Sequence, residues 1–205
     1  MKIKIILCIL LMNTLHLVSQ NNFGIFGGLN ASTVVSTGQT SYGVSLTREY
    51  SFSFHLGVLY EVALQKNIHF SPRLVYSQLG DRDNSDEGAT IVNGVIDGID
   101  DYTINYKLNY LNIPLNFKFY NETYILAGPQ IGFLLSNEKT QFDVGDPKTI
   151  DIGFNIGIGR KINNFFLELN LYHAITPFLE YTNNITIGDF KGYNASVQFS
   201  VGYNL

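Results

Sequence analysis

The chain has 205 residues, which suits one domain with a sizeable interior. It carries 13 Lys and Arg against 17 Asp and Glu, and this acidic balance argues against a nucleic-acid partner. Only 15% of the residues are charged, whereas 13 Tyr and 15 Phe favour β-strands. The single cysteine, Cys8, excludes an internal disulfide.

The first 20 residues have the pattern of a secretory signal peptide. Lys2 and Lys4 precede an apolar run at 5–12, which is too short to span a bilayer as a helix. We therefore expect residues 1–20 to be a cleaved signal peptide and 21–205 to form one exported domain. A first strand or core helix is the less favoured alternative. Cleavage would leave 11 basic against 17 acidic residues, a formal charge of about −6.

After this leader, eight segments alternate between apolar and polar residues with a period of two, which predicts strands. In 51–64 every even position is apolar, whereas His55 and Glu61 occupy the other side. In 150–161 five large apolar residues alternate with Asp, Asn and Gly. The predicted strands are 23–32, 51–64, 68–78, 110–120, 123–135, 150–161, 165–174 and 195–205.

The connections between these strands alternate in length. Short links at 65–67, 121–123 and 163–164 follow the second, fourth and sixth strands, and longer segments follow the others. This asymmetry predicts an all-β, antiparallel, up-and-down transmembrane β-barrel of eight strands, with short periplasmic turns and longer outer loops. Four aromatic residues then fall near one rim, where an aromatic girdle is expected: Tyr60, Phe119, Phe165 and Tyr203.

A soluble eight-stranded barrel or sandwich is the alternative, because a period of two does not say which face points inward. In such a fold the large residues fill the interior. The other face of 150–161 is mostly glycine and small polar residues, which would not fill a dry core. We therefore assign the apolar face to lipid and the polar face to the lumen.

Several segments resemble the PorT-like outer-membrane β-barrel family. They are "GIFGGLN" (24–30), "LGVLYEVAL" (56–64), "SPRLVYSQLG" (71–80), "LNYLNIPLNFKFY" (108–120) and "YILAGPQIGFLLS" (124–136). The resemblance runs from about residue 23 to the C-terminus. It implies an eight-stranded barrel in the outer membrane of a Gram-negative cell and an association with protein secretion. The chain ends "GYNL" rather than in an aromatic residue, so Tyr203 is the nearest candidate for the assembly signal.

Five charged or titratable residues share the inward face in the periplasmic half of the predicted lumen. They are Glu61, His69, Arg73, Lys118 and Glu168. Pairing Leu64 with Ile68 places Glu61 opposite Ser71 and diagonal to Arg73. An unpaired charge in an enclosed interior costs several kcal/mol, so we expect these groups to neutralise one another and close the barrel to ions.

The sequence predicts no catalytic, cofactor or metal site, and we expect the protein not to be an enzyme. His69 and Ser71, like Ser53 and His55, lie two residues apart on one face, the residue types of a His–Ser–acid set in a lipid hydrolase. These pairs point into the lumen rather than to lipid, and neither G-x-S-x-G nor H-E-x-x-H is present. An outer-membrane hydrolase is therefore the least favoured reading.

The longest connection, 81–105, holds seven acidic residues and one arginine. Its "IVNGVI" segment predicts a hairpin on an Asn-Gly turn, so we expect this connection to project as extended strands. The acidic cluster at 81–87 lacks the glycine that an EF-hand loop needs, since Asp86 stands there. A solvated acidic outer loop is therefore favoured over a cation site.

For function, the sequence favours a monomeric, non-enzymatic barrel in contact with outer-membrane lipid. It would act as a scaffold, as a surface for interaction, or with other envelope or secretion proteins. A small solute-binding barrel or narrow channel is the alternative, supported by the inward glycines of 123–135 and 150–161. The interior of an eight-stranded barrel is just wide enough for its own side chains, which favours the first reading.

Overall fold

The computed structural model describes residues 23–37, 48–92, 95–120, 122–139, 146–181 and 190–205. The predicted signal peptide, 1–20, lies outside the described residues. In the described part of the chain, no helix is long and apolar enough to cross a membrane.

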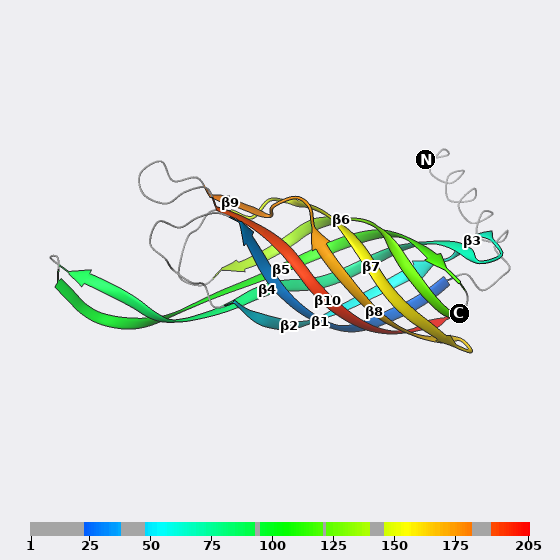
Figure 1. Ribbon diagram of the computed structural model, residues 1–205, viewed down its shortest axis with the longest axis horizontal. Coiled ribbons are helices and arrows are strands. Elements are labelled where there is room, and N and C mark those ends of the chain that lie inside the picture. The colour runs from blue at the N-terminus through cyan, green and yellow to red at the C-terminus, as the bar shows by residue number, and fades with distance from the viewer. Residues whose placement is uncertain (1–22, 38–47, 93–94, 121, 140–145, 182–189) are drawn as a thin grey trace, which may run out of the picture.

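The described residues form one closed antiparallel sheet (Figure 1). The strands are β1 (Phe23–Thr37), β2 (Arg48–Tyr60), β3 (Val62–Gln65), β4 (Ile68–Val92), β5 (Val95–Phe119), β6 (Thr123–Lys139), β7 (Ile150–Ile162), β8 (Phe165–Ala174), β9 (Leu179–Tyr181) and β10 (Phe190–Asn204). Pairing of β1 with both β2 and β10 closes the barrel.

The wall contains eight strands, as the sequence predicted. Glu61 alone separates β2 from β3, and both pair with β4, so they act as one strand of the wall. The short β9 pairs with the start of β10, beyond the residues that β8 contacts. The predicted fold class, an eight-stranded antiparallel barrel, is therefore confirmed.

Side-chain exposure alternates along the wall and confirms which face is apolar. In β8 every residue from Phe165 alternates between exposed and buried. The outer face carries large apolar side chains, such as Phe52 at 80% exposure and Leu29 at 64%. A continuous apolar surface of this kind is stable against lipid rather than water, so the soluble alternative is wrong.

The β4–β5 hairpin is much longer than the predicted strands 68–78 and 110–120. Its pairing continues to Val92 and Val95 across the "NG" turn, whose residues 93–94 lie outside the described part. Figure 1 shows this hairpin projecting beyond the other strands, at the end of the barrel opposite the C-terminus. The Asn-Gly turn predicted that this connection projects as extended strands, and the pairing confirms it. The strand bounds predicted from apolar alternation stopped short, because acidic residues interrupt the alternation.

The opposite end of the barrel has tight turns. Ile162 and Phe165 pair across a two-residue turn in which Asn163 has a positive φ of 56°, a conformation that asparagine tolerates better than most residues. The predicted girdle residues lie at this end, where Phe165 stacks edge-on with Tyr203 and Phe23 packs on Tyr60.

The depth of a residue in the membrane should set the cost of placing a charge on the outer face. Ile156 lies mid-strand in β7 and is 50% exposed, and Ile162 lies at the turn on the same face and is 52% exposed. Ile156→Arg should lower the free energy of unfolding in lipid by about 2–4 kcal/mol, and Ile162→Arg by about 0–1 kcal/mol. Equal losses in urea titrations of the two variants would contradict the lipid-facing assignment.

Candidate functional site

The centre of the candidate site is an ion pair between Arg73 of β4 and Glu168 of β8, on opposite sides of the lumen. Two parallel hydrogen bonds join them, from Arg73 Nη1 to Glu168 Oε2 at 2.5 Å and from Nη2 to Oε1 at 2.8 Å. Their side chains are 3% and 0% exposed. This two-pronged geometry is the strong form of the interaction, and it ties two distant strands together through the interior.

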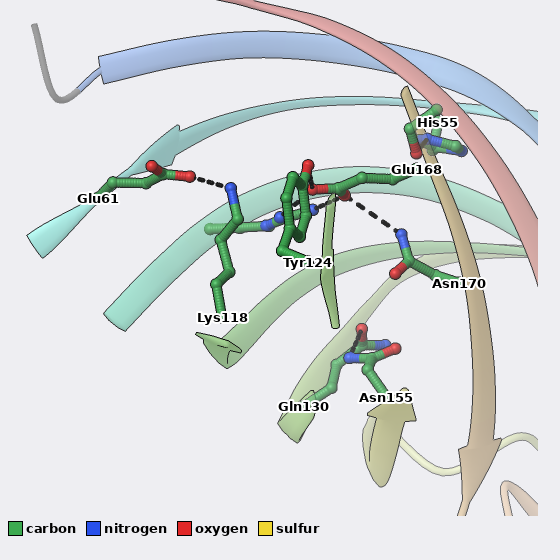
Figure 2. A network of polar contacts seen from close by, with 10 residues as sticks. His55, Glu61, Lys118, Tyr124, Gln130, Asn155, Glu168 and Asn170 are labelled. Carbon is green, nitrogen blue, oxygen red and sulfur yellow. Dashed lines mark hydrogen bonds and ion pairs between the residues drawn. The ribbon is translucent and has the colours of Figure 1, made fainter. Parts of the chain in front are cut away.

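Two further side chains complete the coordination of the Glu168 carboxylate. Tyr124 of β6 donates its hydroxyl to Oε1 at 2.7 Å, and Asn170 Nδ2 lies 3.4 Å from Oε2 (Figure 2). The carboxylate is therefore surrounded by donors from three strands. A buried charge is tolerated only when its lone pairs are satisfied in this way.

A second ion pair lies closer to the short turns. Lys118 Nζ of β5 contacts the carboxylate of Glu61, the residue between β2 and β3 (Figure 2). The ammonium also sits over the Tyr124 ring, 3.9 Å from its centroid. Because a cation over an aromatic face is stabilised by the ring, Tyr124 contacts both ion pairs and links them into one cluster.

Apolar rings enclose this charged cluster. Phe26, Leu59, Val75 and Phe166 form a buried apolar group, and Arg73 Cζ lies 5.2 Å from the Phe26 ring centroid. These side chains exclude water from the Arg73–Glu168 pair. Exclusion strengthens the attraction between the charges and raises the cost of losing either partner.

Inward glycines of the wall make room for the lumen's aromatic rings. A side chain at Gly159 would overlap the Tyr124 ring, and one at Gly202 would overlap the Phe166 ring. Each glycine pairs directly with its aromatic residue across neighbouring strands. Neighbouring side-chain and backbone atoms occupy the space at the glycines of β6 and β7, so these glycines do not line an open bore of the kind that would favour the channel alternative.

Amide and hydroxyl side chains fill the layer next to the charged cluster. Asn155 Nδ2 donates to Gln130 Oε1 at 3.0 Å, and Arg73, Asn116 and Asn170 border a cavity of about 20 Å³. A polar cavity of this size has room for about one water molecule.

His55 occupies the centre of a hydrogen-bonded chain in this layer. Its Nδ1 lies 2.7 Å from Asn30 Oδ1, and its Nε2 lies 2.8 Å from Ser200 Oγ. Asn30 Nδ2 donates to the carbonyl oxygens of Phe54 and Gln78, so Oδ1 is the acceptor for the imidazole N–H. The Ser200 hydroxyl then donates to Nε2. This places a neutral histidine inside the wall with both nitrogens satisfied.

An apolar layer closes the lumen near the long-loop end. Val34, Leu79, Leu108, Tyr110, Phe178 and Leu179 pack together there. Phe178 comes from the segment between β8 and β9, and its N–H donates to Gly192 O at 2.9 Å. Above it, hydrogen bonding from Lys148 lowers the pKa of the exposed Glu180 carboxyl. Within the described residues, side chains thus fill the lumen at the charged cluster and at this apolar layer, and leave the small cavity beside Arg73.

Four of the five predicted lumen residues meet as two ion pairs, but the pairing differs from the one expected. Glu61 contacts Lys118 and not Arg73, because Glu61 lies nearer the rim while Arg73 reaches across to Glu168. The backbone of His69 lies between Ala63 and Lys118, and its side chain is half-buried. Tyr124 was missed, since its inward position beside the glycine-rich "AGPQIG" segment carries no charge signal.

Of the two serine–histidine pairs considered for a hydrolase, Ser53 and His55 bond to other groups. Ser53 donates its hydroxyl to the Gln78 carbonyl, while His55 bonds to Ser200 of β10. Within the described residues, no group of three or more His, Cys, Asp and Glu side chains is placed to hold a metal ion. The side chains of the acidic segment 81–87 lie outside the described part, so its preference for solvent over a cation stays a prediction.

Comparison with known proteins gives a family and several structures of the same shape. The model of the family described as "Outer membrane protein beta-barrel domain" matches residues 18–180. No curated protein matches the chain. Neisserial surface protein A is 12% identical with a TM-score of 0.52, over 89% of this chain and 97% of that one. At this identity the likeness shows the fold alone.

Two other solved structures are similar at a lower level. OprG from Pseudomonas aeruginosa is 10% identical with a TM-score of 0.48, over 90% of this chain and 96% of its own. Ail, the attachment invasion locus protein of Yersinia pestis, is 12% identical with a TM-score of 0.45, over 91% of this chain and all of its own.

The Arg73–Glu168 pair can be tested by a double-mutant cycle on the free energy of unfolding. Arg73→Met should destabilise the barrel by about 3–5 kcal/mol, because it leaves a buried carboxylate unpaired. Adding Glu168→Gln should restore much of that loss. The exposed Lys107–Glu138 pair, with nitrogen and oxygen 3.7 Å apart, is the control and should couple by about 0–1 kcal/mol. Strictly additive losses at Arg73 and Glu168 would show that the pair is not coupled.

The glycine and aromatic pairs can be tested in the same assay. Gly159→Ala should cost about 1–3 kcal/mol, because the added methyl group overlaps the Tyr124 ring. Gly27→Ala is the control, because the atom nearest its added methyl group would lie 3.2 Å away, so its loss of stability should be smaller than that of Gly159→Ala. If both variants keep wild-type stability, Tyr124 does not depend on the space above Gly159.

Proposed function

Since the chain belongs to the outer membrane protein beta-barrel domain family, we propose that it is a monomeric, non-enzymatic surface-interaction protein. In this proposal it binds an envelope or exported protein through the β4–β5 hairpin. One observation carries it: this hairpin continues as a two-stranded ribbon beyond the wall of the barrel.

The length of the ribbon follows from the pairing. β2 pairs with β4 as far as Asp83, and β6 pairs with β5 as far as Tyr106. Beyond these points, the described residues of β4 and β5 pair only with each other. Nine residues of β4, 84–92, therefore extend past the wall. At roughly 3.3 Å per residue, this extension is about 30 Å long.

Such a ribbon presents two edges of backbone N–H and C=O groups. A two-stranded hairpin is only marginally stable alone in water, so a partner that adds a strand would stabilise it. Segment 81–105 also carries seven acidic residues and one arginine. The partner should therefore present basic residues, and its association should weaken as the salt concentration rises.

The filled interior supports a binding role over transport or catalysis. The charged cluster and the apolar layer around Phe178 occupy the lumen, and the small cavity beside Arg73 suits one water molecule. Ser200, which bonds to His55, is 2% exposed, so a lipid substrate has no room at its hydroxyl. The resemblance to PorT-like proteins supports a secretion-associated partner as the more specific form of the proposal.

The test is crosslinking in intact outer membrane with a photoreactive residue placed at Thr90. We expect a discrete crosslinked product that is lost when residues 85–102 are replaced by Asn-Gly, which closes a two-residue turn on the Asn84–Thr103 pair. Heat-modifiable migration on a gel should show that the shortened barrel still folds. Deleting residues 141–144 from another connection is the control and should leave the product unchanged.

Failure to find any product with the intact hairpin would contradict the proposal. The proposal would also be contradicted if the shortened variant, carrying a photoreactive residue elsewhere at the long-loop end, captured the same partner equally well.

A further inference from the structure

We propose that the short-turn rim of the barrel holds one phospholipid of the periplasmic leaflet, with its acyl chain in a groove beside Phe119 and its phosphate on Arg160. This site is separate from the ribbon and from the lumen cluster. It follows from an apolar groove, a displaced turn residue and a group of cations at the same depth.

The groove lies on the outer face where β4, β5 and β6 begin or end. Its lining includes Ile68, Phe119 and Ile125, which are direct cross-strand neighbours in one row. Phe119 is 39% exposed and Ile125 is 47% exposed. The groove has a volume of about 350 Å³, which lies at the lower end of the range for small-ligand sites.

Tyr120 forms the rim side of this groove. Alternation from exposed Phe119 would turn Tyr120 into the lumen, but its φ of 75° takes the backbone out of the strand, and its side chain is 62% exposed. A bulky residue with positive φ is uncommon and needs support. Here its N–H donates to the Asn67 carbonyl at 2.9 Å, which ties the two neighbouring turns together.

Cations lie beside the groove at the rim. Ile125 pairs with Ile158, and Arg160 follows Ile158 on the same exposed face, one step nearer the turn. Lys161 is also exposed, and its N–H donates to the Glu122 carbonyl at 2.7 Å. On the other side of the groove, exposed Lys66 precedes Asn67. Glu122 contributes the one exposed carboxylate in this set of described residues.

The groove suits the acyl chain of a phospholipid, and the cations beside it suit the phosphate headgroup. The groove floor continues into the lipid-facing surface, where Phe117 packs against Phe70 with ring centroids 5.2 Å apart. An arginine on the lipid face is costly at mid-depth but not near the interface, where lipid phosphates lie. Its planar donors fit a phosphate, and an excess of cations favours an anionic headgroup such as phosphatidylglycerol.

Native mass spectrometry of the full-length mature barrel in detergent, with added lipid, tests the site. We expect phosphatidylglycerol to be retained in preference to phosphatidylethanolamine, with one molecule bound most strongly. Arg160→Gln should reduce retention of phosphatidylglycerol about fivefold, because it removes one cation from the headgroup site. Lys191→Gln, which removes an exposed cation at the opposite rim, is the matched control and should change nothing.

A second variant separates the groove from the charge. Ile125→Trp should fill the groove and reduce retention of both lipids while heat-modifiable migration shows a folded barrel. Inorganic phosphate at millimolar concentration should not displace the bound lipid, because the acyl chain supplies part of the binding. Retention that is equal in wild type, Arg160→Gln and Ile125→Trp would overturn the proposal, and so would an equal loss in Lys191→Gln.

Discussion

The structure depends on one constraint: a barrel whose outer face meets lipid must place its charged residues inside, and there each needs a partner. Arg73 and Glu168 meet that requirement through two hydrogen bonds across the lumen, at side-chain exposures of 3% and 0%. The pair lies 95 residues apart in the chain and joins opposite walls. The proposed binding role therefore falls to the surfaces at the two ends of the barrel rather than to the lumen.

The packing around the pair follows from the same constraint. Tyr124 must approach Glu168 to donate its hydroxyl and must lie under Lys118, and this position is open because Gly159 has no side chain. Phe166 and Gly202 repeat the arrangement on β8 and β10. A ring placed over a glycine thus fills an interior that would be too narrow if every inward residue were large.

The alternation of residues such as those of 150–161 predicted the strands and their outer face, since both depend only on local periodicity. The short turns predicted the order of the strands in the wall and their antiparallel direction. The contacts inside the lumen were less predictable, because a period of two gives the face of Glu61 but not which residue reaches it across the barrel. His55 shows the same limit, as its partner Ser200 is 145 residues away. The Asn-Gly turn predicted the projecting β4–β5 ribbon, but not where its strands begin and end, because acidic residues interrupt the apolar alternation there.

The most direct test of whether ions can pass through the lumen is single-channel recording of the mature protein in planar bilayers. At neutral pH and 1 M KCl, we expect no steady conductance from the wild-type barrel, because paired charges and the Phe178 layer lie across the path. Insertion should be verified in the same bilayers by protease digestion of the projecting hairpin. A reproducible ohmic conductance from verified insertions would show that the lumen is open to ions.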